Sequence, residues 1–124
     1  MNLKDKTVII TGASSGIGKA CAEKFAKQGA NLVLAARQYG TLCEIKQDLE
    51  KRFNIQVLPV QCDVSKEDEC QNLIHQAVST FKKIDILVNN AGISMRALFN
   101  DLDLVVLQKL MDVNFWGAVF CTKY

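Results

Sequence analysis

Residues 7–18 read TVIITGASSGIG, a short β-branched run that leads into three closely spaced glycines. β-Branched residues favour strands, and the apolar residues that follow recur at helical spacing. We therefore predict a strand over Thr7–Ile10 and a helix over Gly18–Gln28, joined by a glycine turn. The helix positions expected to face the core are Ile17, Cys21 and Phe25.

The same alternation of short apolar runs and longer amphipathic runs continues along the chain. Further strands are expected at 32–35, 57–60 and 84–88, and further helices at 41–53, at 65–81 and from just after residue 101 or 103. Continuous apolar strands separated by amphipathic helices indicate a parallel sheet that helices cover on both faces.

Right-handed crossovers favour a doubly wound, Rossmann-type sheet, whose usual strand order begins 3-2-1-4. Pro59 cannot donate to a sheet ladder, which agrees with an edge position for the third strand. We predict one α/β domain over residues 1–124, an incomplete doubly wound parallel sheet of four strands in the order 3-2-1-4 with flanking helices.

Local signals predict how the helices begin and end. Gly29 should follow the first helix in the left-handed conformation. Thr41, with Glu44 three residues later, should cap the second helix, and Ser65 should cap the third.

Composition excludes several classes of function. The chain has 124 residues and a net charge of +2, without a basic stripe, so a nucleic-acid partner is not expected. No apolar stretch approaches the ~18 residues that span a bilayer, and the polar start does not resemble a signal peptide. Five cysteines without a Cys-x-x-Cys pair favour reduced thiols in a cytoplasmic protein. His75 is the only histidine, so no metal site is expected.

The glycines at 12, 16 and 18 point to a phosphate-binding turn. Glycine permits unusual backbone angles and lets a phosphate approach the free N–H groups at a helix start. The alternative is a plain tight turn between strand and helix. The strand before, the helix after and the alternating pattern favour binding of a dinucleotide.

At this point the sequence resembles the short-chain dehydrogenase/reductase family. The resemblance rests on TGASSGIG at 11–18, Cys62-Asp63-Val64, NNAG at 89–92 and Asn114. These motifs follow one another in the family's order and spacing across nearly the whole chain.

The resemblance implies a role for each matching residue. The glycine loop would wrap the pyrophosphate, Asp63 and Val64 would meet the adenine ring, and the NNAG stretch would pass the ribose. The cofactor-binding residues so implied are Gly12, Ser14, Ser15, Gly16, Ile17, Gly18, Asp63, Val64, Asn90, Ala91 and Gly92. From the residues alone, Asp63 could equally be a loop residue and Asn89-Asn90 a plain turn.

Arg37 indicates which cofactor is bound. NAD is usually met by an acidic residue at the end of the second strand, where this chain has Ala36 and Arg37. Arg37 could instead hold a 2′-phosphate, and Ser14 resembles the position that adds a hydroxyl contact to it. We therefore expect NADP in preference to NAD. The alternative for Arg37 is an ordinary surface arginine.

The resemblance also implies a function for the parent protein. Asn114 would belong to the catalytic set and help hold a water in a proton relay, although alone it could be a buried polar residue. The family's catalytic serine and Tyr-x-x-x-Lys motif are not found within residues 1–124. We expect an incomplete chain, inactive alone, from a homo-oligomeric NADP-dependent oxidoreductase that transfers hydride between nicotinamide and a carbonyl or secondary alcohol. The alternatives are a non-catalytic dinucleotide sensor and another Rossmann-type enzyme such as a methyltransferase, against which Arg37 argues.

Overall fold

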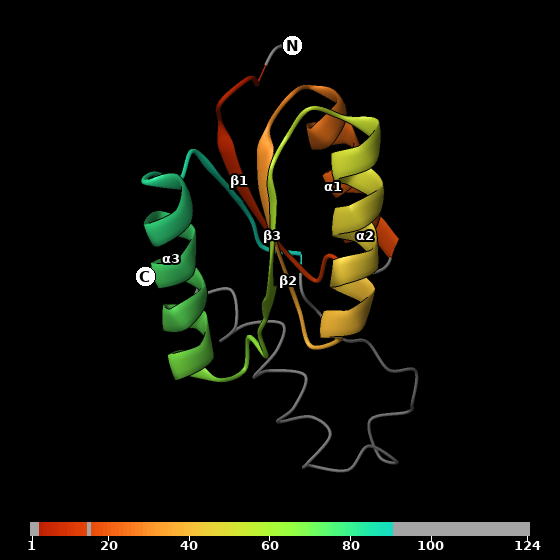
Figure 1. The fold of residues 1–124 in the computed structure, drawn as a ribbon. Helices are drawn as coiled ribbons and strands as arrows, with labels where there is room; N and C mark the ends of the chain where they lie inside the picture. The colour runs from red at the N-terminus through yellow and green to blue at the C-terminus, as the bar shows by residue number, and fades with distance from the viewer. Residues whose placement is uncertain (1–2, 15, 91–124) are drawn as a thin grey trace.

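Strands and helices alternate along the chain in the computed structural model, which describes residues 3–14 and 16–90 (Figure 1). The strands are β1 (Thr7–Thr11), β2 (Asn31–Ala36), β3 (Val57–Gln61) and β4 (Ile86–Val88). The helices are α1 (Gly16–Lys27), α2 (Tyr39–Arg52) and α3 (Glu67–Phe81). All strand pairs are parallel and the order is β3-β2-β1-β4, which confirms the predicted doubly wound arrangement.

The helices form a layer on each side of the sheet. α1 and α2 cover one face and α3 covers the other (Figure 1). The connections from β1 to β2 and from β2 to β3 run in one direction, so right-handed crossovers place both helices on one side. The connection from β3 back to β4 runs the other way, and α3 therefore lies on the opposite side. The direction in which successive connections cross the sheet therefore reverses between the neighbouring strands β1 and β4.

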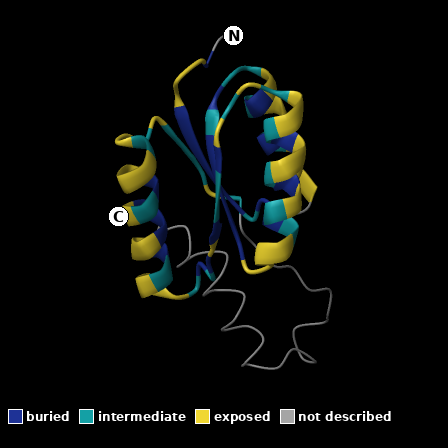
Figure 2. Cartoon of the chain, viewed as in Figure 1, coloured by how far each residue is buried: buried dark blue, intermediate teal, exposed yellow. Residues whose placement is uncertain are grey.

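The core consists of two apolar layers, because successive strand residues point to opposite faces. Val8 and Leu32 pack toward α1 and α2, whereas Ile9 and Val33 pack toward α3. All four side chains are fully buried. Figure 2 shows the same pattern, with buried strands between helices whose outer faces are exposed. Burial on both faces explains why these strands are continuous apolar runs.

The predicted core face of α1 is correct for two of its three residues. Cys21 and Phe25 are partly buried and pack against the core, whereas Ile17 is 73% exposed. The buried residues of α1 are Gly18, Ala22 and Ala26. Small residues let the helix approach the sheet closely, so the larger apolar residues lie along its flank. The predicted left-handed residue after α1 is confirmed, because Gly29 has φ of 91°.

The predicted helix caps were wrong. α2 begins before Thr41, with Gln38 as its N-cap residue and no side-chain cap bond. α3 has Lys66 as its N-cap residue, again without a side-chain bond. Ser65 instead donates from its N–H and its hydroxyl to Asp63 Oδ1, at 3.0 and 2.7 Å. Ser65 therefore forms a local turn with Asp63, an alternative to capping that serine and aspartate side chains commonly offer the backbone.

β4 is shorter than the predicted strand over 84–88. Asp85 precedes it and is joined to Thr7 twice: its N–H donates to the Thr7 carbonyl at 2.9 Å, and its Oδ2 accepts from the Thr7 N–H at 2.8 Å. That N–H donor, assisted by Lys83 at 3.4 Å, holds the pKa of the Asp85 carboxyl below its usual range despite some desolvation. The Asp85 side chain thus bonds the backbone of Thr7 just before the β1–β4 ladder begins at Val8 and Ile86. None of the helices in 3–14 and 16–90 is long and apolar enough to cross a membrane.

Candidate functional site

The carboxyl ends of the four strands bring the candidate residues to one edge of the sheet. Gly12, Arg37, Asp63 and Asn90 each lie one or two residues beyond the end of β1, β2, β3 and β4 respectively. The crossovers reverse between β1 and β4, so this edge contains the topological switch point of the sheet. In open α/β sheets, ligands bind in the crevice at such a point.

The glycine loop leaves open space beside its second glycine. Gly12 and Gly16 have φ of 64° and 60°, which side-chain-bearing residues rarely adopt. A Cβ built on Gly16 would meet no atom of the described residues within 4 Å, whereas one on Gly18 would overlap the Gly12 carbonyl oxygen. The first turn of α1 contains no acidic residue that would compete for its free N–H groups. The loop therefore fits an anionic group such as a phosphate.

Asn90 and Thr11 join this loop to the end of β4. The Asn90 N–H donates to Thr11 Oγ1 at 3.0 Å, and the Thr11 hydroxyl donates to the Val88 carbonyl at 3.4 Å. The Asn90 side chain donates from Nδ2 to the Gly12 carbonyl at 3.3 Å. The two sides of the switch point are thereby held in register by side chains as well as by the strand ladder.

Asp63 is a tightly bonded carboxylate at the exit of β3. Its Oδ1 accepts both bonds from Ser65, and its N–H donates to Glu69 Oε1 at 3.0 Å. Burial raises the pKa of Asp63, but the Ser65 bonds and the charges of Arg37 and Lys66 outweigh it and leave the pKa below its usual range. Asp63 is therefore an ionised acceptor at neutral pH.

Arg37 is the first residue after β2, and its side chain is exposed. Among the residues that the structure describes, its guanidinium forms no ion pair, although its charge helps to lower the pKa of Asp63. Its carbonyl accepts from Gln61 Nε2 at 3.3 Å. A guanidinium at this edge, unpaired within residues 3–14 and 16–90, is suited to a second anionic group.

The remaining predicted residues differ in their surroundings. Val64 is buried, and its carbonyl accepts from the Cys70 thiol at 3.3 Å, so its side chain belongs to the core beside α3. Ser14 is partly buried in the loop. The predicted residues that lie outside the described part of the chain are Ser15, Ala91, Gly92 and Asn114.

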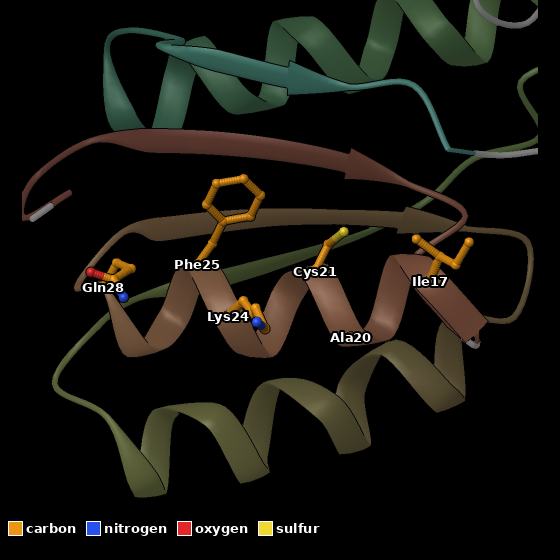
Figure 3. Close-up of a pocket in the computed structure, with 6 residues that line it drawn as sticks. All are labelled: Ile17, Ala20, Cys21, Lys24, Phe25 and Gln28. Atoms are coloured by element: carbon orange, nitrogen blue, oxygen red, sulfur yellow. The ribbon is translucent and has the colours of Figure 1, made fainter. Parts of the chain in front are cut away.

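Ile17 also lines an apolar hollow of about 460 Å³ along the flank of α1. Its other lining residues are Ala20, Cys21, Lys24, Phe25 and Gln28. Cys21 and Phe25 point from the helix toward the sheet (Figure 3), where they pack against the core together with Ile86 of β4. Lys24 is the single charged lining residue, so this hollow lacks the paired polar groups found at the strand ends.

Comparison with known proteins decides the family. The short chain dehydrogenase family model matches residues 6–124. The chain belongs to the short-chain dehydrogenase family. The resemblance seen in the glycine loop and the NNAG stretch is thereby confirmed, and with it the classification among dehydrogenases and related oxidoreductases.

Curated short-chain dehydrogenases include near relatives from plants. The chain is 43% identical over 124 residues to an 11-beta-hydroxysteroid dehydrogenase A of Arachis hypogaea, covering 99% of this chain and 36% of that protein. It is 42% identical over 120 residues to an 11-beta-hydroxysteroid dehydrogenase A of Sesamum indicum, covering 96% and 34%. The chain thus spans about a third of the length of these relatives.

Solved structures of short-chain dehydrogenases share the fold. L-Sorbose reductase from Gluconobacter frateurii, complexed with NADPH and L-sorbose, matches with a TM-score of 0.95 at 36% identity, covering 99% of this chain and 47% of that chain. A family member from Burkholderia phymatum in complex with NAD matches with a TM-score of 0.94 at 32% identity, covering 99% and 43%. Both cofactors therefore occur among similar folds.

The sequence reasoning missed three residues that shape this short-chain dehydrogenase site. Thr11 links β1 to β4, Glu69 holds the Asp63 backbone, and Gln61 holds the Arg37 carbonyl. Glu69 lies in the acidic first turn of α3, where the helix dipole alone accounts for a carboxylate. Gln61 could have been noticed as a polar residue at the end of an otherwise apolar strand. The sequence pattern does not indicate that its partner is the Arg37 carbonyl.

Proposed function

We propose that this chain is the dinucleotide-binding part of an NADP-dependent oxidoreductase. The whole protein would transfer hydride between the nicotinamide of NADP and a carbonyl or secondary alcohol. The observation that carries the proposal is the open space at Gly16 beside the N-terminus of α1, at the switch point of the sheet. The names of the relatives, hydroxysteroid dehydrogenases and a sorbose reductase, support hydride transfer at such carbon centres.

Each candidate residue has a defined part in binding the cofactor. The loop from Gly12 to Gly18 would hold the pyrophosphate with backbone N–H groups. Asp63, an ionised acceptor, would receive a hydrogen bond from the adenine amino group. The stretch that begins at Asn90 would line the ribose. The cofactor supplies the hydride, and the protein supplies its position.

The preference for NADP rests on Arg37. A 2′-phosphate beside this guanidinium would receive charge-assisted hydrogen bonds worth about 1.5–3 kcal/mol. That energy corresponds to roughly 10- to 150-fold in affinity. Ser14 would add a hydroxyl contact from the glycine loop. An aspartate in place of Arg37 would repel the phosphate and accept from the ribose hydroxyls of NAD.

Binding titrations of the purified chain with NADPH and NADH at one fixed salt concentration test both the binding of a dinucleotide and the preference for NADP. The chain should bind both cofactors and bind NADPH more tightly, and Arg37→Asp should reverse the preference. Lys51→Asp makes the same change in charge at the opposite end of α2 and should leave the preference intact. A folded chain that binds neither cofactor would contradict the proposal, and an unchanged preference in Arg37→Asp would contradict the role of Arg37.

Catalytic activity and oligomeric state are proposed here for the whole protein and not for residues 1–124 alone. We propose that Asn114 acts in its catalytic set, that residues beyond 124 supply the acid–base machinery, and that the whole protein is a homo-oligomer. Activity with NADPH and a set of ketones, measured on the chain and on a version extended through the family's Tyr-x-x-x-Lys motif, tests this. Only the extended version should turn over substrate. Turnover by the 124-residue chain would contradict the assignment.

A further inference from the structure

The end of β3 holds the segment that carries Arg37. Ala36 pairs with Gln61 in the parallel register, and the Ala36 carbonyl accepts from the Cys62 N–H at 3.0 Å. One residue later, the Arg37 carbonyl accepts from the side chain of Gln61 at 3.3 Å. β3 thus contacts this segment through its backbone ladder and, beyond the ladder, through one side chain.

Arg37 is the only residue between two regular hydrogen-bond patterns. Ala36 ends β2, and Gln38 is the N-cap residue of α2, whose carbonyl accepts from the Leu42 N–H at 3.3 Å. The carbonyls before and after Arg37 are therefore held by backbone donors. The carbonyl of Arg37 itself is held by Gln61, which orients the peptide plane that follows Arg37. The direction of the Arg37 Cα–Cβ bond depends on that plane.

The position of Gln61 suits this task. Val57 and Ala36 belong to the apolar layer beside α1 and α2, and Gln61 shares their face of the sheet because side chains alternate along a strand. This is the face onto which the chain turns as it leaves β2 for α2. Gln61 is exposed at the very end of the strand, so its amide reaches this turn without being buried.

A carboxylate near the Arg37 guanidinium competes with any ligand for its hydrogen-bond donors. Asp63 lies close enough for the Arg37 charge to lower the pKa of its carboxyl. An Arg37 side chain without a fixed direction would be able to pair with this carboxylate, and its donors would then no longer be available to bind an anionic ligand. Lys66, whose charge also lowers the pKa of Asp63, pairs with Glu69 at 3.6 Å. A restraint on the Arg37 backbone reduces the number of directions that the side chain can take from its Cα.

We propose that Gln61 is a positioning residue for cofactor discrimination, which aims Arg37 at the 2′-phosphate through the Arg37 carbonyl. The inference rests on the proposed binding of NADP. Gln61 itself touches no part of the cofactor in this scheme. It contributes by reducing the number of directions among which the Arg37 side chain must be ordered when the phosphate binds.

The test is a set of NADPH and NADH titrations on the chain and its variants. Gln61→Met keeps the length of the side chain and removes its donor, and should lower the ratio of NADPH to NADH affinity by about 3- to 10-fold, the range expected for one neutral hydrogen bond. The loss should fall on NADPH alone. Gln56→Met, immediately before the same strand and also exposed, is the matched control and should leave the ratio unchanged.

A double-mutant cycle separates positioning from general support. In an Arg37→Ala background, Gln61→Met should have no further effect on the ratio, because its effect passes through the guanidinium. Equal weakening of both cofactors, or a full effect of Gln61→Met without Arg37, would overturn the inference. If the wild-type chain binds neither cofactor, the proposed function itself is overturned. A wild-type preference that Arg37→Asp reverses and Gln61→Met leaves intact overturns only the role of Gln61.

Discussion

The side-chain amide of Asn90 donates a hydrogen bond to the carbonyl of Gly12 at 3.3 Å, across 78 residues of sequence. Gly18 lies against both groups, and a Cβ placed on it would come within 2.6 Å of Asn90 Nδ2. The absence of a side chain at Gly18 therefore lets the end of β4 reach the glycine loop. The shape of the loop depends on this contact as well as on its own glycines.

Gly18→Ala should destabilise the fold. The new methyl group would push the Gly12 carbonyl and the Asn90 amide apart, at a cost of about 1–3 kcal/mol for overpacking. Gly40→Ala is the matched control, because a Cβ there meets no atom within 4 Å in the part of the chain that the structure describes, and the residue lies in α2. It should be neutral or stabilising by up to about 1 kcal/mol. Urea unfolding gives both free energies, and equal values for the two variants would contradict this account.

Gly16→Ala should act on binding as well as on folding. Its φ of 60° is strained for alanine, which costs about 1 kcal/mol, and the new Cβ enters the space proposed for the pyrophosphate. NADPH and NADH share this group, so the affinities of both should fall by the same factor. Titration beside Gly40→Ala measures this. A change in the ratio of NADPH to NADH affinity would show that Gly16 lies beside a part of the cofactor other than the pyrophosphate.

Asp85→Asn should weaken the fold at neutral pH and reduce its sensitivity to acid. The Thr7 N–H and Lys83 lower the pKa of Asp85 in the folded state, so its carboxylate stabilises the fold above about pH 3.9, its usual unfolded value. This contribution is lost as the pH falls through the lowered pKa. Stability curves of wild type and variant should therefore converge in acid.

A charge control is needed for that experiment. Asp5→Asn removes the same charge from the exposed turn before β1, where no hydrogen bond to Thr7 is involved. Its stability difference from wild type should stay smaller than that of Asp85→Asn at pH 7. Curves for Asp85→Asn that stay parallel to wild type down to pH 2 would show that the Thr7 contact does not matter.

Glu50→Ala should open the outer edge of β3. Val57 points its backbone groups away from β2: its N–H donates to Glu50 Oε2 at 2.9 Å, and its carbonyl accepts from Lys46 Nζ at 3.0 Å. Pro59 has no N–H, so α2 and this proline together block the edge against a further strand. We expect a loss of about 0.5–1.5 kcal/mol and a greater tendency to aggregate, because the Val57 donor becomes free.

Glu44→Ala, an exposed position on the same helix, is the control for Glu50→Ala. It should change stability by less than about 0.5 kcal/mol. Urea unfolding and light scattering at equal concentration provide the comparison. Identical behaviour of the two variants would contradict the blocking role of Glu50.

Local pattern was enough to predict the strand order and the edge of the sheet at which the candidate residues meet. Apolar runs such as Leu32–Ala35 can only be buried on both faces, and crossover handedness then leaves few topologies. Pro59 identified the edge strand without knowledge of its neighbours. The glycine loop and Asp63 follow directly from where the strands end. These features depend on residues near one another in sequence, so they are readable from it.

Contacts between distant segments were decided by the tertiary structure. The face of α1 depends on how closely Gly18 and Ala22 approach the sheet, which a helical stripe of larger residues does not reveal. Gln61 and Asn90 acquired partners 24 and 78 residues away. Hydrogen bonds of this kind leave no period in the sequence, because they are selected only after the strands have been brought side by side.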